Sequence, residues 1–364
     1  MPERRQRARE MGVRIGSHDT GEHNAITDVP GVRVGHTTLI EGDGPLVIGR
    51  GPVRTGATAI LPHAGNLIRE PVEAAHYVFN GAGTTAGLSL IDEFGQIETP
   101  VVLTNTFGVG AAYDAVTRYM FRTAFAEGEN PRWFSPTVGE TFDGGLNDAA
   151  GLHVREEHIV AAIESASGGR VAEGSVGAGT GTSCCGYKGG IGVSSRVVVV
   201  GDASHTVGAL VQSNFGGDLV VDGVPVGRLL AEADAAEQDP GSIMVVIATD
   251  APLTSRQLYR VAKRGSFGLA RAGSSGGHGS GDYFIAFSTG YRACLAAGET
   301  AGIAAISRRE QLLDPLFAAT ADAVEEAILN SVFASDTMTG RDGATLPGLP
   351  LDRVRDLLAQ HGRI

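Results

Sequence analysis

The chain has 364 residues, of which 42% are hydrophobic and 19% are charged. This balance is typical of a soluble globular protein with a substantial core, arranged as one large domain or two of ordinary size. The formal net charge of −12 disfavours broad binding to nucleic acid or to an anionic membrane, because both need Lys and Arg patches against phosphate. We therefore expect no nucleic-acid partner and no membrane partner.

The first 23 residues are predicted to form a flexible arm. Arginines crowd residues 1–10, and the polar Ser17-His18-Asp19 follows where a secretory signal would carry its apolar stretch. No run of 18 apolar residues suggests a membrane-spanning helix. We expect a cytoplasmic protein whose body, residues 24–364, is a single domain.

The body opens with β-branched residues on both sides of Pro30-Gly31, which is typical of a strand and a turn. Thr254 and Gln257 form a capping-box pattern at the start of a helix, and a second, amphipathic helix is expected over residues 315–329. Apolar runs predict strands at residues 57–62, 101–104, 196–200, 242–248 and 283–287. Mixed strands and helices joined by short turns indicate an α/β (α+β) layered fold.

Two segments in the first half suggest chemistry only weakly. Residues 140–148 concentrate carboxylates, which is typical of glycosidases and of ammonium anchors, but more often of a solvated loop. The segment GAGTGT at residues 177–182 would let a backbone approach an anion closely. It lacks the Gly-Lys-Ser/Thr ending and the glycine spacing of phosphate loops, which favours a structural turn or a wall of backbone N–H groups beside a site.

The cysteines and histidines do not suggest a metal site. Cys184, Cys185 and Cys294 make an odd count, and the first two are adjacent, so we expect thiols rather than structural disulfides. No Cys-x-x-Cys pair and no His-Glu-x-x-His segment occurs, and the ten histidines are scattered. The sequence therefore predicts no metal and no cofactor.

Two polar groups border predicted strands in the second half. Asn214 follows a strand in LVQSNFG, where its amide could donate to an oxyanion, although an Asx-turn is the simpler interpretation. Ser280 and Asp282, in GHGSGD, could orient a hydroxyl against a carboxylate, although a turn is again simpler.

The bond between Gly241 and Ser242 stands out because a serine there begins an apolar run behind the loop-like residues 231–240. If the hydroxyl attacked the preceding carbonyl, hydrolysis would leave Ser242 as a new terminus with a nucleophile and an α-amine. That amine, with a reference pKa of about 7.7–8.0, can act as general base. An ordinary linker before a strand is the alternative.

The segments together resemble the DmpA/BapA family of L-aminopeptidase/D-esterases and β-peptidyl aminopeptidases. The resemblance implies a precursor that cleaves itself, here between Gly241 and Ser242, into chains 1–241 and 242–364. It also implies a four-layer α-β-β-α sandwich and a homo-oligomer, commonly a tetramer of the cleaved heterodimers. The segments that carry it are NAITDVPGVRVGHTT, GAGTG with YKGGIG, LVQSNFG, GSIMVVIATDAPL and GHGSGDYFIAFST.

The resemblance also implies roles for single residues. Ser242 matches the nucleophile and Asn214 the oxyanion-hole side chain. Ser280 and Asp282 match the pair that positions the nucleophile's proton transfers. Glu140 matches a carboxylate that holds the free amino group of the substrate, which is a charge-assisted interaction.

Position 142 departs from the family pattern. Relatives are expected to place a tyrosine there whose hydroxyl assists the oxyanion, whereas this chain has Phe142 beside the substrate. Because loss of one oxyanion donor typically costs about a hundredfold or more in rate, Asn214 and backbone N–H groups would have to suffice, unless the match of this segment is shifted by a residue or two.

The resulting hypothesis is a self-processing serine aminopeptidase or amidase. It would remove N-terminal residues from short peptides, amides or esters through an acyl-enzyme on Ser242, and its partner would be a small substrate with a free amino group. L-α, β and D residues all remain open. One alternative is an acyltransferase of the ornithine acetyltransferase type, which uses threonine at the cut, and another is a non-catalytic protein that binds a small amine.

Overall fold

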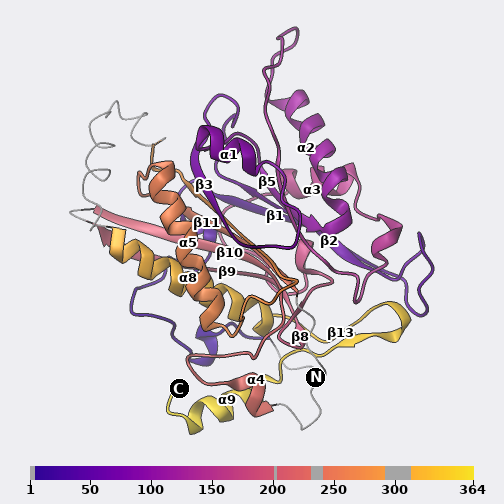
Figure 1. Ribbon diagram of the computed structural model, residues 1–364, viewed down its shortest axis with the longest axis vertical. Helices are drawn as coiled ribbons and strands as arrows, with labels where there is room; N and C mark the ends of the chain where they lie inside the picture. Colours follow the sequence, from indigo (N-terminus) through magenta and orange to yellow (C-terminus); the bar gives the residue numbers. More distant parts are fainter. Residues whose placement is uncertain (1–4, 201–202, 231–240, 292–312) are drawn as a thin grey trace.

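The structure is a computed structural model that describes residues 5–200, 203–230, 241–291 and 313–364 (Figure 1). The loop-like residues 231–240 and Cys294 lie outside the described residues. Two sheets packed face to face form the centre of the molecule, and the site described below lies where several of their strands begin or end.

The larger sheet has six strands in the order β4-β3-β12-β11-β10-β9. In it β11 runs parallel to β12, and the other neighbouring strands are antiparallel. Its strands are β3 (Val72–Gly81), β4 (Gln96–Ile97), β9 (Gly190–Val200), β10 (Ala203–Asn214), β11 (Ser242–Thr249) and β12 (Gly281–Ser288).

The smaller sheet has four strands in the order β1-β2-β5-β6, with β5 and β6 parallel and the other pairs antiparallel. Its strands are β1 (Arg33–Glu41), β2 (Val53–Leu61), β5 (Val101–Asn105) and β6 (Thr137–Thr141). Two short hairpins stand apart from both sheets, namely β7 (Ser183–Cys184) with β8 (Tyr187–Lys188) and β13 (Met338–Thr339) with β14 (Thr345–Leu346). All five strands predicted from apolar runs are present.

The helices are α1 (Leu88–Phe94), α2 (Val109–Thr123), α3 (Glu156–Glu164), α4 (Val226–Leu230), α5 (Ser255–Arg271), α8 (Asp314–Phe333) and α9 (Leu351–Gln360). α5 starts as predicted, since Thr254 is its N-cap and Gln257 completes the capping box. α8 confirms the second predicted helix, but its expected amphipathic character is wrong. Nearly every residue from Leu316 to Phe333 is buried, because the helix packs against α5 on one side and β9 and β10 on the other.

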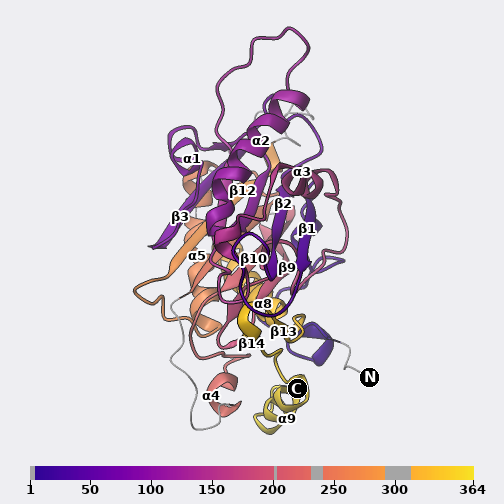
Figure 2. The same ribbon diagram turned by 90° about the vertical axis from the view of Figure 1, so that its right-hand side faces the viewer.

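Alternate residues of β11 contribute to two different cores. Ile243, Val245 and Ile247 belong to the core beneath α5 and α8, while Met244 and Val246 belong to the core between the sheets. A third core joins the smaller sheet to α2 and α3. Helices thus cover the outer face of each sheet, which confirms the expected four-layer α-β-β-α sandwich (Figure 1, Figure 2).

Residues 5–23 do not form the flexible arm expected from their composition. Ala8 and Ile15 are buried, and the Arg7 guanidinium pairs with the Glu173 carboxylate at 2.7 Å. Arginines that suggested a free, solvated segment bind buried acids and backbone carbonyls instead. Within the described residues, no helix has the length and apolar character needed to cross a membrane.

Candidate active site

Ser242 is the first residue of β11 and lies between two neighbouring strands. The register places it opposite Asn214 of β10 and opposite Gly281 of β12. The backbone N–H of Gly281 donates a hydrogen bond to Ser242 Oγ at 3.1 Å. Gly241 has no room for a side chain, since a Cβ there would lie 1.9 Å from the Asn214 carbonyl oxygen. Close packing therefore requires glycine before this serine.

Asn214 is the last residue of β10, and only 5% of it is exposed. Its Oδ1 accepts a hydrogen bond from the Ser183 N–H at 2.9 Å, and its Nδ2 donates to the Phe142 carbonyl oxygen at 2.9 Å. The amide thus binds two distant segments, which disfavours the simpler Asx-turn interpretation. A side-chain amide carries two N–H bonds, and among the described residues only the Phe142 carbonyl accepts from this one, which leaves an N–H for a further acceptor.

Ser280 and Asp282 lie on either side of Gly281 at the start of β12. The Ser280 hydroxyl donates to Asp282 Oδ1 at 2.5 Å, and both side chains are buried. Burial raises the pKa of Asp282, while hydrogen bonds from Ser280 and Asn80 oppose that shift. The expected hydroxyl–carboxylate pair is therefore present. In the described part of the chain, the hydrogen bond to the Ser242 hydroxyl comes from the intervening Gly281 N–H rather than from Ser280.

Glu140, on β6, is buried, and both of its carboxylate oxygens accept hydrogen bonds. The Thr84 backbone N–H donates to Oε1 at 2.7 Å, and the Thr106 hydroxyl donates to Oε2. The Tyr283 hydroxyl donates to the Gly83 carbonyl at 2.8 Å, which ties the Thr84 loop to the start of β12. These contacts connect Glu140 to the strand that neighbours Ser242.

Phe142 contributes its backbone rather than a side-chain donor. The residue is 52% exposed, and its ring lies edge to face with the ring of Phe107, with 6.2 Å between the ring centroids. Its carbonyl oxygen is the acceptor for Asn214. The rest of the acidic segment is not the solvated loop that is most common for such sequences, because Asp143 and Asp148 are buried.

Four donors at the site were not foreseen from the sequence, and three of them are backbone N–H groups. Their direction depends on sheet register and loop geometry rather than on residue type. Thr106 lies two residues beyond the strand predicted at residues 101–104, and this place near a strand end was the only signal in the sequence. The four donors are Gly281 N–H, Thr84 N–H, Ser183 N–H and the Thr106 hydroxyl.

Neither thiols nor a metal cluster adds to this site in the described residues. Cys184 and Cys185 are free and buried, and a hydrogen bond with Cys184, together with burial, raises the pKa of the Cys185 thiol. Across residues 5–200, 203–230, 241–291 and 313–364, no three His, Cys, Asp or Glu side chains gather to hold a metal ion.

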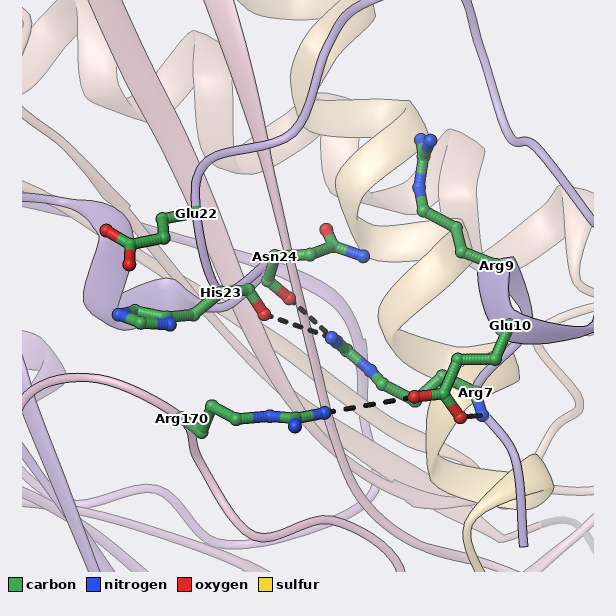
Figure 3. Close-up of a pocket in the computed structure, with 7 residues that line it drawn as sticks. All are labelled: Arg7, Arg9, Glu10, Glu22, His23, Asn24 and Arg170. Carbon is green, nitrogen blue, oxygen red and sulfur yellow. Dashed lines mark hydrogen bonds and ion pairs between the residues drawn. The ribbon is translucent and has the colours of Figure 1, made fainter.

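A pocket of about 250 Å³ lies beside the N-terminal residues and contains none of the predicted site residues. Figure 3 shows the Arg7 guanidinium donating to the His23 and Asn24 carbonyls, and Arg170 paired with Glu10. Arg9 binds the Glu326 carboxylate. Each arginine of this pocket thus has an oxygen partner, and the contacts hold the N-terminal residues to the body. The lining residues are Arg7, Arg9, Glu10, Glu22, His23, Asn24 and Arg170.

Known proteins are similar to this chain over most of its length. The model of Peptidase family S58 matches residues 24–346. Beta-peptidyl aminopeptidase BapA of Sphingosinicella microcystinivorans is 43% identical, over 98% of this chain and 93% of the relative.

Two solved structures match nearly the whole chain. The PH0078 protein of Pyrococcus horikoshii OT3 is 46% identical with a TM-score of 0.90, over 99% of this chain and 100% of that one. The L-aminopeptidase D-Ala-esterase/amidase of Ochrobactrum anthropi is 38% identical with a TM-score of 0.85, over 98% and 99% of the two chains. The latter is described as a prototype for the serine aminopeptidases and as a new variant of the Ntn hydrolase fold.

Proposed function

The chain belongs to peptidase family S58 and is a hydrolase that acts as an aminopeptidase, and from this premise we propose that it cleaves itself before Ser242 and then uses Ser242 as its nucleophile. Residues 24–364 would form one catalytic domain, cut into chains 1–241 and 242–364. The observation that carries the proposal is the strand register, which sets Ser242 Oγ beside the Gly281 N–H and opposite Asn214.

Self-cleavage would proceed by transfer of an acyl group from nitrogen to oxygen. Ser242 Oγ attacks the Gly241 carbonyl carbon, the C–N bond breaks, and the nitrogen gains a proton as an ester forms. Water hydrolyses that ester and leaves Ser242 with a free α-amine. Before the cut this nitrogen is an amide and cannot act as a base, so the proton transfers are assigned to the buried pair of Ser280 and Asp282, which flanks the Gly281 N–H that binds Ser242 Oγ.

Turnover would use the same groups on a substrate. The α-amine accepts the hydroxyl proton as Oγ attacks the carbonyl of the first residue, and the free N–H of Asn214 donates to the oxyanion. The proton then passes to the leaving amine, or to the leaving alcohol of an ester. Water hydrolyses the acyl-enzyme and regenerates Ser242.

Glu140 is proposed to hold the substrate's free amino group. Two of the roughly four lone-pair sites on its carboxylate already bind Thr84 and Thr106, so sites for an ammonium group remain. The exposed rings of Phe142 and Phe107 would then lie beside the substrate. The activities named for the relatives make β-peptides, peptides with an N-terminal L residue, and esters and amides of D-alanine the classes to assay. A tetramer of cleaved heterodimers is proposed on the family resemblance alone. The cytoplasmic location expected from the sequence is kept as part of the proposal.

The test is the intact mass, the N-terminal sequence and the amidase activity of the parent and of Ser242→Ala. The parent should yield chains of about 25 and about 13 kDa, in proportion to their lengths, and the smaller should begin Ser-Ile-Met-Val. Ser242→Ala should stay uncut and hydrolyse no p-nitroanilide. As a matched control, Ser194→Ala removes a buried strand hydroxyl that binds the Ala323 carbonyl, and should still be cut and active. A cut or active Ser242→Ala protein would refute the proposal.

A further inference from the structure

Lys188 is fully buried although no predicted function uses it. Its Nζ donates to the Gly189 carbonyl at 2.7 Å and to the Gly179 carbonyl at 3.0 Å. It therefore joins the GAGTGT turn to the β7–β8 hairpin, in which Lys188 pairs with Ser183. Ser183 is the residue whose N–H binds Asn214 Oδ1. Lys188 thus fixes the backbone that holds one end of the Asn214 amide.

Asp143 is buried on the other side of the same amide. It follows Phe142, whose carbonyl accepts the hydrogen bond from Asn214 Nδ2. The Asp143 side chain accepts from Asn147 Nδ2 at 3.0 Å and from Asn105 Nδ2 at 3.4 Å, and its carbonyl accepts from the Asn147 N–H at 3.1 Å. These bonds close the turn after Phe142 and fix the direction of its carbonyl.

The two anchors meet through the GAGTGT turn. A Cβ on Gly181 would lie 2.9 Å from the Asp143 Cβ, so the turn that Lys188 holds packs directly on Asp143. Burial lowers the pKa of Lys188 to about 7 and raises that of Asp143 to about 6, which shows how unfavourable this interior is for charge. Burial of a lysine lowers the stability of the folded state unless its contacts compensate, so we expect these contacts to have a structural or functional role.

We propose that Lys188 and Asp143 are positioning residues for the hydrolytic reaction: each fixes one of the two backbone segments that orient the Asn214 amide, so that its remaining N–H points at the oxyanion. The inference rests on the proposed function of Asn214 and assigns the residues that set its direction. Neither residue touches the substrate. Their effect is expected on the chemical step, because an oxyanion donor acts mainly in the transition state.

The experiment is a double-mutant cycle with Lys188→Met and Asp143→Asn, each made alone and in the Asn214→Ala background. The cut fraction of each protein is measured by mass spectrometry, and kcat is expressed per cleaved chain. Each single variant should lose about tenfold to a hundredfold in kcat with KM within about threefold. In the Asn214→Ala background neither change should lower kcat further by more than about twofold, since the donor is already gone.

Asn330→Ala is the matched control. Asn330 is also a buried polar residue, but it binds Ala8 and Val193 instead of a segment at the site, so its loss should lower the melting temperature and leave kcat unchanged. Equal losses of kcat in both backgrounds would overturn the positioning role. If Lys188→Met does not fold, the nearly isosteric Asp143→Asn decides the question alone. An active Ser242→Ala protein would instead refute the proposed function, so the two failures are distinct.

Discussion

Phe142 contacts Asn214 through its backbone carbonyl, so the side chain at this position can change without moving the amide. The residue is half exposed, and its ring lies edge to face with the ring of Phe107 and next to Gly144. The tyrosine expected here from the family pattern would add one hydroxyl on Cζ of a residue that is half exposed. The main contribution of residue 142 to the site is therefore its backbone carbonyl, which accepts the hydrogen bond from Asn214.

We expect Phe142→Tyr to keep kcat within about a factor of two and stability within about 0.5 kcal/mol of the parent, because substitutions at exposed positions are usually mild. Asn214→Ala, measured in parallel, should lower kcat about a hundredfold or more. Steady-state kinetics and denaturant unfolding check both variants. A tenfold gain in kcat for Phe142→Tyr would mean that the new hydroxyl reaches the oxyanion, contrary to the exposed ring position.

The candidate site residues could be proposed from sequence because the family segments have particular residue types at fixed spacings. Ser280 and Asp282 are two residues apart, and their contact follows directly from that spacing. The contacts of Asn214 could not be foreseen. They join it to Ser183 and Phe142, which are 31 and 72 residues away in the chain, and such contacts depend on the packing of the two sheets.

Helix α8 shows where the sequence pattern failed at the scale of an element. Its polar residues suggested a solvent face, but Asp322, Glu325 and Glu326 are buried and meet arginines from other segments. β9 was predicted to start at residue 196 but starts at Gly190, because glycines there resembled a turn. A Cβ on Gly192 would lie 1.9 Å from the Ala327 carbonyl oxygen, so this glycine allows α8 to pack on the strand.

Glu325 on α8 should give the stability of the protein a measurable pH dependence. Burial raises its pKa to about 7, Arg271 opposes this shift and Asp322 adds to it. The folded state thus binds the Glu325 proton more tightly than the unfolded state does. This contribution to stability is complete below about pH 4.5 and is lost as the pH rises through about 7.

We therefore expect Glu325→Gln to remove part of the fall in unfolding free energy between pH 5 and pH 8, by at most about 1.4 kcal/mol per pH unit. Denaturant unfolding of parent and variant at several pH values measures this, and their difference isolates Glu325 from other titrating groups. Gln360→Ala, at an exposed position without a titratable group, is the control and should leave the pH dependence of the parent unchanged. Identical curves for Glu325→Gln and the parent would contradict the assigned pKa.

At the scale of the whole molecule, both chains would still contribute strands to the same sheet after the proposed cut. β11 and β12 belong to chain 242–364, and their neighbours β10 and β3 belong to chain 1–241. Strand pairing on both sides of the β11–β12 pair therefore joins the two chains. Glu326 adds a buried ion network across the same boundary. Its carboxylate lies 2.6 Å from Arg196 Nη2 and 2.9 Å from Arg9 Nε. The N-terminal residues that were expected to be a free arm thus help to hold the two chains together.

Glu326→Gln should lower the unfolding free energy by about 3–5 kcal/mol, because it leaves the buried Arg196 guanidinium and the partly buried Arg9 guanidinium without their anion. The shape of the side chain is nearly unchanged, so lost packing contributes little. Guanidinium chloride unfolding of the cleaved protein gives the free energy. Size-exclusion chromatography shows whether chains 1–241 and 242–364 of the variant separate at a lower denaturant concentration than those of the parent.

Asp352→Asn provides the contrast, since its pair with Arg355 is largely exposed and solvent screens it. That variant should unfold at the parent's midpoint. If Glu326→Gln also unfolded at the parent's midpoint, the attraction within the ion network would only offset the cost of desolvating its charges. The strand pairing on both sides of β11 and β12 would then suffice to keep the chains associated. Separation of the chains at low denaturant would instead show that the ion network across the cut, and with it the packed N-terminal residues, is what makes a cleaved protein behave as one molecule.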